Sequence, residues 1–423
     1  MGITEQLIKF STVEVPEEAA AMMRLSLLDW AACGIAGAGE ADFASFRRAQ
    51  MVEDGPAHVF GGDTLGAAAA ALVNGTLSHA LDYDDTHFAH IGHPSVAVLP
   101  CVMALAETLD IPLGDAVDAA TIGVEASIIV GVWLGRAHYQ IGYHQTATAG
   151  AFGATVAAAR LLGLDKEQTR HALGLCASMA SGVKAQFGTM AKPLNAGLGA
   201  RTGVEAALWA QAGMTAAQDG LAGPLGFGET HHAEALEVKL PRKEWQISTI
   251  SHKFHACCHG LHAMLEALSG AKIQADRIAG IKIRTHPRWM SVCNISAPAT
   301  GLEVKFSYAH TAAMTLLGHA TGVVENFSDE IAKDKTLIAL RSKVEVVADE
   351  TLSETQSQVT ITLETGEVRR LRHDLLAPIS LEQRSEKLRK KAIALLGHEP
   401  AEQLWNAVIG AELDAVTACF SAQ

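Results

Sequence analysis

Hydrophobic and polar positions in the first two thirds of the chain repeat mostly with the period of an α-helix. Pro16, followed by two glutamates, starts a helix over 19–35 that Gly37 ends. Two later segments, 64–77 and 146–162, carry small residues on every face, which predicts helices that neighbours approach closely in the middle of a bundle. Further helices are predicted at 95–109, 114–134, 165–181, 199–212 and 260–269.

The pattern changes near residue 272. Segments 278–285, 343–348 and 358–363 alternate with period two, and a hairpin turn at 364–367 leads into a strand at 368–372. Helices are predicted between the first two strands and again at the end of the chain, at 306–321, 329–340, 382–396 and 402–420. The sequence therefore predicts a mainly α fold. From about residue 272 strands and helices combine in an α+β arrangement, and helices follow again beyond residue 382.

Composition and charge narrow the class of protein. The chain has 423 residues, 49% of them hydrophobic, and a net charge of -13. Nucleic acid is not an expected partner, because its binding needs a basic patch and the longest basic run is only 387–391. The negative net charge does not exclude a small anionic substrate, which needs only a few cations near its binding site. The seven cysteines form no C-x-x-C pair, and the N-terminus lacks a signal-peptide pattern. We expect a cytoplasmic protein with no membrane-spanning segment.

The stretch 77–100 holds the densest set of proton-handling groups. Three aspartates, four histidines and a threonine lie between the apolar runs 66–81 and 96–106. Ionisable groups in a partly buried loop must pair to offset desolvation, and their pKa values shift, as in active sites. Two other interpretations stay open: a solvated loop that is rich in Asp and His, or a metal site, although the spacing fits no EF-hand and no H-E-x-x-H motif.

Three further positions carry candidate chemistry. His144 stands just before a helix start, where an anion is favoured, or it simply caps the helix. Lys192 is the lone lysine of the glycine-rich segment 187–200, and it is a carboxylate clamp, a base with a shifted pKa, or a surface lysine. The segment 251–262 has four histidines, two adjacent cysteines and Lys253. Adjacent cysteines chelate one metal poorly, so a cationic wall is favoured over zinc.

Taken together, these segments resemble the MmgE/PrpD family, which includes 2-methylcitrate dehydratase, cis-aconitate decarboxylase and iminodisuccinate epimerase. The motifs that carry the resemblance are Asn74-Gly75, His79-Ala80-Leu81-Asp82-Tyr83-Asp84-Asp85-Thr86, Gly92-His93-Pro94-Ser95, Gly142-Tyr143-His144, Gly188 to Leu194, Lys253 with Cys257-Cys258, and Lys305-Phe306-Ser307. The resemblance implies a large all-helical domain, 1–270, that is completed by C-terminal helices at 383–423, and a smaller α+β lid domain, 271–382, inserted before them. It also implies that the pocket lies between the domains, that the protein is a homodimer, and that the chemistry needs neither a metal nor another cofactor.

The resemblance also implies a set of site residues. The catalytic residues would be Asp82, His93, His144 and Lys192, and the substrate-binding residues Thr86, Lys253, His310 and Tyr308. Two segments depart from the family. Ser307-Tyr308-Ala309-His310 stands where the family often has Ser-Leu-Pro-Tyr, so a tyrosine proton donor is replaced by His310 or displaced to Tyr308. The segment 253–259 ends in a histidine where the family has an arginine.

The expected function is that of a lyase or isomerase acting on a small di- or tricarboxylate. A hydrogen or a carboxyl group leaves a carbon next to a carboxylate, and lysines stabilise the enediolate-like charge while an imidazole or Asp82 moves the proton. The motifs do not separate dehydration, decarboxylation and epimerisation. A non-catalytic carboxylate-binding protein of the same fold is one alternative, and a metal-dependent hydrolase is another.

Overall fold

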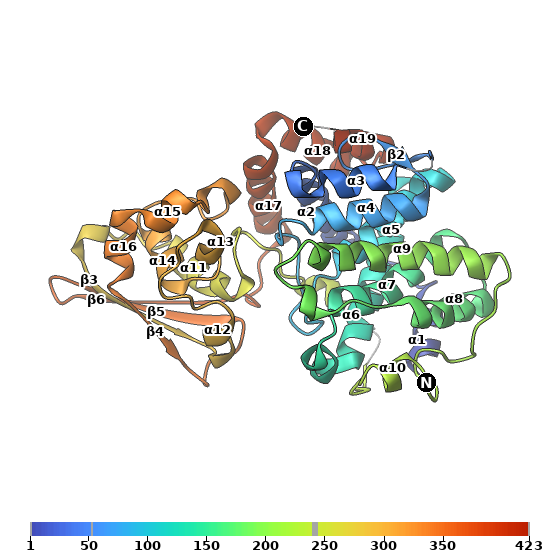
Figure 1. Ribbon diagram of the computed structural model, residues 1–423, viewed down its shortest axis with the longest axis horizontal. Helices are drawn as coiled ribbons and strands as arrows, with labels where there is room; N and C mark the ends of the chain where they lie inside the picture. The colour runs from blue at the N-terminus through green and yellow to red at the C-terminus, as the bar shows by residue number, and fades with distance from the viewer. Residues whose placement is uncertain (1, 52–53, 239–243, 422–423) are drawn as a thin grey trace. The chain divides into compact units, whose positions relative to one another are not determined.

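The computed structural model describes residues 2–51, 54–238 and 244–421, which form two compact units (Figure 1). The first, here called the helical unit, comprises Met1–His252 and Leu381–Gln423. The second, the mixed unit, comprises Lys253–Ser380. The chain thus leaves the helical unit once and returns to it for its C-terminal helices.

The regular secondary structure of the helical unit is almost all helical. They are α1 (Ile3–Phe10), α2 (Glu17–Ala38), α3 (Ala44–Gln50), α4 (Ala67–Ser78), α5 (Ser95–Leu109), α6 (Leu113–Ile141), α7 (Gln145–Leu161), α8 (Lys166–Met179), α9 (Ala191–Gln211), α10 (Phe227–Thr230), α17 (Leu381–Leu396), α18 (His398–Gly410) and α19 (Leu413–Ala418). A two-stranded antiparallel sheet, β1 (Ala57–His58) with β2 (Thr64–Leu65), precedes α4. The sequence did not predict this sheet, because two-residue strands carry no period.

Small residues bring α4, α7 and α9 into direct contact at the centre of the helical unit. A Cβ atom added to Gly197 of α9 would lie 2.2 Å from the Leu72 carbonyl oxygen of α4. A Cβ atom added to Gly203 would lie 2.4 Å from Ala154 of α7. No side chain fits at such distances, so the glycines set the spacing of these helices. The predicted close approach of the small-residue helices is therefore confirmed.

Two helices, α2 and α6, are long and apolar enough to cross a membrane. In the structure, 83% of the apolar window of α2 and 89% of that of α6 are buried inside the protein. Their composition is accounted for by this burial, because core helices are apolar on all sides.

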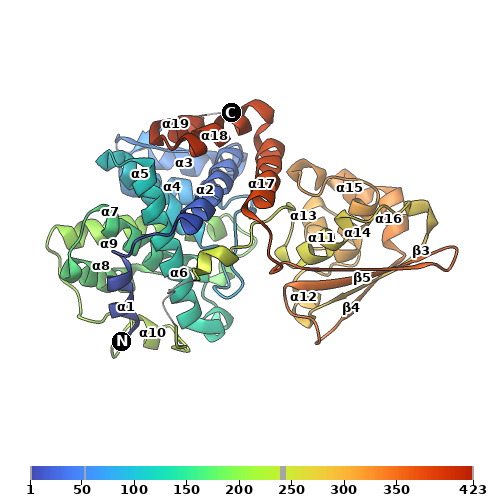
Figure 2. The same cartoon turned by 180° about the vertical axis from the view of Figure 1, so that it is seen from behind.

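The C-terminal helices pack against the N-terminal part of the chain. Helix α17 lies beside α2, as Figure 2 shows from behind, and α18 contacts both helices. Lys391 of α17 pairs with Asp29 of α2 at 2.5 Å, and both side chains are almost fully buried. Both ends of the chain therefore contribute to one helical core.

The mixed unit is built on a four-stranded sheet with the strand order β4-β3-β5-β6. Strands β3 and β4 are parallel, with Lys282 opposite Glu345, and the other pairs are antiparallel. Helices α11 and α14 pack against the sheet (Figure 1). The elements are α11 (His262–Ser269), β3 (Ile278–Thr285), α12 (Pro287–Val292), α13 (Gly301–Val304), α14 (Tyr308–Leu316), α15 (Asp329–Lys333), α16 (Lys335–Arg341), β4 (Val344–Ala348), β5 (Gln356–Leu363) and β6 (Val368–Asp374).

The predicted fold class is confirmed at the level of a mainly α protein with a smaller α/β part. The unit boundary lies at 252/253, whereas the sequence placed the change at 270/271. The physical reason is helix α11, which packs against β5 and β6 and so belongs with the sheet. Its sequence is helical, and a change of period therefore marks the first strand rather than the start of the unit.

Candidate active site

The loop 79–94 joins α4 to α5 and carries three of the predicted site residues, Asp82, Thr86 and His93. Asp82 has a φ of 50°, in the left-handed region that Asp and Asn tolerate better than most residues. Thr86 and Ser251 exchange backbone hydrogen bonds of 2.9 and 2.8 Å, and His87 donates its backbone N-H to the carbonyl of Gly92. These contacts satisfy backbone groups of a loop that the flanking apolar helices bury.

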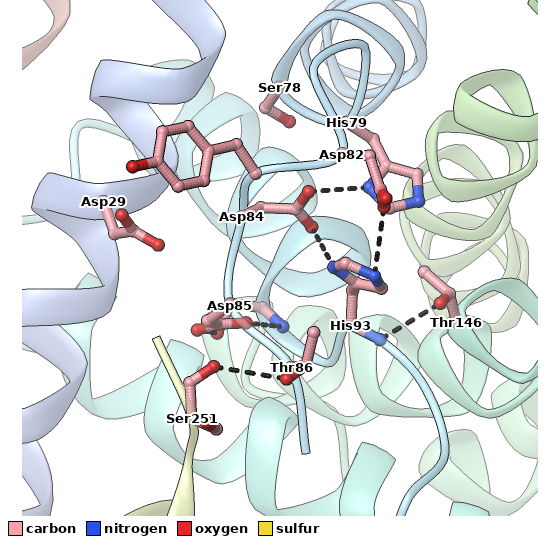
Figure 3. A network of polar contacts seen from close by, with 12 residues as sticks. Asp29, Ser78, His79, Asp82, Asp84, Asp85, Thr86, His93, Thr146 and Ser251 are labelled. Atoms are coloured by element: carbon pink, nitrogen blue, oxygen red, sulfur yellow. Dashed lines mark hydrogen bonds and ion pairs between the residues drawn. The ribbon is translucent and has the colours of Figure 1, made fainter. Parts of the chain in front are cut away.

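The carboxylate of Asp84 lies between two imidazole rings (Figure 3). Its Oδ1 accepts a hydrogen bond of 2.8 Å from Nδ1 of His79, and its Oδ2 lies 2.9 Å from Nδ1 of His93. Burial opposes ionisation, but the contacts with His79 and His93 outweigh it and hold the pKa of Asp84 well below its usual range. Burial lowers the pKa of His79 to about 4, against the influence of Asp84. The site therefore contains an ionised carboxylate beside a neutral His79.

Asp82 links His93 to Lys192. Nζ of Lys192, at the start of α9, lies 2.5 Å from Oδ1 of Asp82, and Nε2 of His93 lies 3.4 Å from the same oxygen. The Asp82 side chain is 47% exposed, whereas those of His93 and Lys192 are 13% and 15% exposed. A cation, a carboxylate and an imidazole are thus in contact, and the carboxylate is the most exposed of the three.

His144 immediately precedes α7 and lies next to the same group of residues. Its ring stacks on that of His79 with centroids 6.0 Å apart, and it meets the Phe187 ring edge-on at 5.0 Å. Burial, assisted by the charge of Lys192, holds the pKa of His144 well below its usual range. Nδ2 of Asn195 lies 3.2 Å from Nδ1 of His144. Because an amide nitrogen only donates, the neutral ring carries its proton on Nε2.

The structure therefore brings Asp82, His93, His144 and Lys192 together in the helical unit. Thr86 belongs to the same loop, and its hydroxyl donates a bond of 3.2 Å to the carbonyl of Ser251. The side chains that the sequence did not select are His79, Asp84 and Asn195. His79 and Asp84 lie in the stretch 77–100, but composition does not show which members pair. Asn195 follows Lys192 by three residues, a helical spacing that places both on one face.

The end of the loop is fixed to neighbouring helices through Asp85. The Asp85 carboxylate accepts hydrogen bonds from Ser95 at 2.5 Å and from Ser26 of α2 at 2.9 Å. Ser26 also contacts Nε2 of His252 at 3.0 Å, and Arg384 of α17 donates to the carbonyl of Ile250. Burial raises the pKa of Asp85 to about 6. These contacts are structural, since they fix the loop to α2 and α5.

The remaining predicted residues belong to the mixed unit. Lys253 is buried there, with 1% of its surface exposed. The Tyr308 hydroxyl donates to the Gly260 carbonyl and contacts Thr285 at 2.8 Å. His310 contacts the Ile331 carbonyl through Nε2 and Arg341 through Nδ1. Tyr308 and His310 are fully buried, and their polar atoms contact other groups inside the mixed unit.

Three side chains are close enough to hold a metal ion. One potential ligand atom from each of His79, Asp84 and His93 lies within 4.8 Å of the other two. The same arrangement is accounted for without an ion, because a carboxylate faces the Nδ1 atoms of both rings at hydrogen-bonding distance. A metal ion bound through those nitrogens would have to displace their protons.

Comparison with known proteins identifies the class. The MmgE/PrpD N-terminal domain matches residues 3–237, and the MmgE/PrpD C-terminal domain matches residues 255–412. The chain therefore belongs to the MmgE/PrpD family, as its motifs indicated.

The relatives include named enzymes. Cis-aconitate decarboxylase of Aspergillus terreus is 30% identical over 295 residues, which cover 63% of this chain and 59% of that protein. Cis-aconitate decarboxylase of Homo sapiens is 28% identical over 363 residues, which cover 79% of this chain and 74% of that protein. The chain thus spans about three fifths of the length of the Aspergillus relative and about three quarters of the human one.

Proposed function

We propose that this protein is a lyase that acts on a small di- or tricarboxylate by forming and protonating a carbanion next to a carboxylate. The observation that carries the proposal is the contact chain from Lys192 through Asp82 to His93. A fixed ammonium group can hold a substrate carboxylate and the charge that develops on it, while an adjacent imidazole can move a proton. The names of the relatives support decarboxylation among the reactions of the family.

In a decarboxylation, the bond between a carboxyl group and the substrate carbon breaks and carbon dioxide leaves. The electron pair stays on the carbon skeleton and is delocalised as an enediolate, which Lys192 stabilises. His93, protonated on both nitrogens for this step, then delivers the Nε2 proton to the carbon. It regains a proton from solvent, which reaches the site at the exposed carboxylate of Asp82. His144 is neutral and contributes a hydrogen bond from Nε2 to the substrate.

The proposal extends to the mixed unit. We propose that this unit acts as a lid and that Lys253 supplies a second cation. Lys253 follows Ser251, the backbone partner of Thr86, by only two residues, which is the reason to keep it in the site. We also propose a cytoplasmic homodimer, and sedimentation equilibrium on the purified chain tests the dimer.

The experiment is proton NMR of the purified protein in deuterium oxide with methylcitrate, cis-aconitate and iminodisuccinate. Each reaction gives a different product, and an epimerase also exchanges its α proton for deuterium. We expect conversion of one of these compounds, and loss of carbon dioxide from cis-aconitate is the outcome that the relatives favour. Tight binding without product or exchange would instead support a non-catalytic binding protein. A stoichiometric bound metal required for turnover would support the hydrolase alternative.

A further inference from the structure

Asp84 has a place in the site that direct contact with a substrate does not explain. It is 1% exposed, and each of its two oxygens faces the Nδ1 atom of one imidazole, at 2.8 Å for His79 and 2.9 Å for His93 (Figure 3). Burying a carboxylate costs free energy that an apolar side chain of the same size would not cost. Packing alone therefore does not account for an aspartate at this position.

The contact with Asp84 decides which nitrogen of His93 carries a proton. Nδ1 of His93 makes an ion-pair contact of 2.9 Å with Oδ2 of Asp84 rather than a well-aligned hydrogen bond. An unprotonated nitrogen at that distance would place its lone pair against an anionic oxygen, so Nδ1 carries hydrogen. In a neutral His93 the other nitrogen, Nε2, is then unprotonated. That nitrogen lies 3.4 Å from Asp82, the carboxylate in contact with Lys192. The free lone pair thus points to the part of the site where the proposed proton transfer takes place.

His93 is also held from two other directions. Its backbone N-H donates a hydrogen bond of 3.1 Å to the Thr146 hydroxyl of α7. Its ring meets the His79 ring edge-on, with centroids 4.6 Å apart. His79 in turn is fully buried and hydrogen-bonded to the second oxygen of Asp84. Rotation of the His93 ring would move Nδ1 away from Asp84 and break their contact.

We propose that Asp84, supported by His79, is a positioning residue that holds His93 in the tautomer protonated on Nδ1, so that Nε2 is the atom that exchanges a proton. This inference rests on the proposed function only in taking His93 as the group that moves the proton. The tautomer itself is a property of the protein without substrate.

Histidine-labelled ¹⁵N NMR of the deuterated full-length protein tests the proposal directly. Long-range proton–nitrogen correlations, with the His93 signal assigned by its loss in His93→Gln, report which nitrogen carries hydrogen. We expect His93 to be protonated on Nδ1 in the wild-type protein and to show a different or mixed tautomer in Asp84→Asn. His93 protonated on Nε2, or a mixture in the wild-type protein, would overturn the proposal whether or not the variant folds.

Kinetics supply the second measurement. Asp84→Asn should lower kcat at least about tenfold and change KM by less than about threefold, because the substrate does not touch Asp84. Asp85→Asn is the matched control, since it places an amide at the adjacent buried carboxylate and should leave the His93 tautomer unchanged. An Asp84→Asn enzyme with wild-type kcat would contradict the positioning role. A correct tautomer without turnover of any tested carboxylate would refute the proposed function and leave the positioning of His93 standing.

Discussion

At the scale of single residues, the backbone of Asp82 allows a clean test of its charge. Asp82 has a φ of 50°, and asparagine tolerates that region as well as aspartate does. Asp82→Asn therefore keeps the shape of the loop and removes the charge between Lys192 and His93. We expect kcat/KM to fall by a factor of about 10² to 10⁴, the usual contribution of an acid-base group. Steady-state kinetics on the accepted carboxylate measure the effect.

Asp110 provides the control for this substitution. It follows α5 with a φ of 55°, is exposed, and lies outside the candidate site. Asp110→Asn repeats the chemical change in the same backbone conformation and should leave kcat/KM unchanged. Equal losses in both variants would show that the effect is one of backbone conformation, and the assignment of Asp82 to catalysis would then fail.

The sequence predicted which residue types make the site but not how they pair. Asp82, His93, His144 and Lys192 were selected from the motifs, and the structure brings them together. The role of Asp84 was missed because Asp82, Asp84 and Asp85 are chemically alike and stand within four positions of one another. Only the folded loop shows that Asp84 faces two imidazoles while Asp85 faces two serines.

At the scale of elements, helix α17 holds the loop 79–94 through Lys391. Its Nζ pairs with Asp29 of α2 at 2.5 Å and donates to the Tyr83 carbonyl at 2.6 Å. The same ammonium group lies 4.0 Å from the centroid of the Tyr83 ring. Burial raises the pKa of Asp29 to about 7 although Lys391 opposes the shift. The buried ammonium group of Lys391 therefore connects α17, α2 and the loop that contains Tyr83.

Removing this cation should destabilise the helical unit. Lys391→Met leaves Asp29 buried without its partner, and we expect a loss of about 3–5 kcal/mol in the free energy of unfolding. Urea denaturation followed by far-UV circular dichroism measures it. The neighbouring Lys390 is an exposed i,i+4 partner of Glu386, so Lys390→Met should change stability by less than about 0.5 kcal/mol. Similar midpoints for the two variants would contradict a structural role for the buried pair.

Elements with a long, regular period were predictable, and elements set by tertiary contacts were not. Strand β3 was predicted at its observed bounds, 278–285, because it alternates over its full length. Strands β1 and β2 were missed. They are positioned by Asn74 of α4, whose side chain accepts from the Phe60 backbone N-H and donates to the His58 carbonyl. No local pattern reports such a contact.

At the scale of the whole molecule, buried histidines predict sensitivity to acid. Burial lowers the pKa of four of them to between about 3 and about 4: His79, His87, His90 and His138. The unfolded chain therefore binds more protons than the native state at mildly acidic pH. The stability that neutral histidines contribute is complete above their unfolded pKa of about 6.5 and is lost as the pH falls towards 4.

Three buried acids act in the opposite direction, because their raised pKa values favour the folded state at lower pH: Asp29, Asp85 and Glu125. The histidines outnumber them, so we expect the urea midpoint to fall between pH 7 and pH 5. A midpoint that is constant or rises on acidification would contradict the neutral, buried state of these histidines.

The two-part architecture could be predicted from the change of period and from the motifs, whereas the residue at which the mixed unit begins could not. The return of the chain to the helical unit was implied by the resemblance to the family, and in the structure α17 lies against α2. The assignment of α11 to the mixed unit depends on its packing against β5 and β6, which its own sequence does not encode.

The central claim is that Lys192 stabilises negative charge on a small carboxylate while His93 moves the proton. The most direct measurement is carboxylate turnover in deuterium oxide, followed by proton NMR, for the wild-type protein and Lys192→Met, with Lys166→Met of the exposed α8 start as the control. The account predicts that Lys166→Met behaves as wild type and that Lys192→Met loses at least about 10²-fold in kcat/KM while staying folded. Unchanged turnover by Lys192→Met would contradict the account.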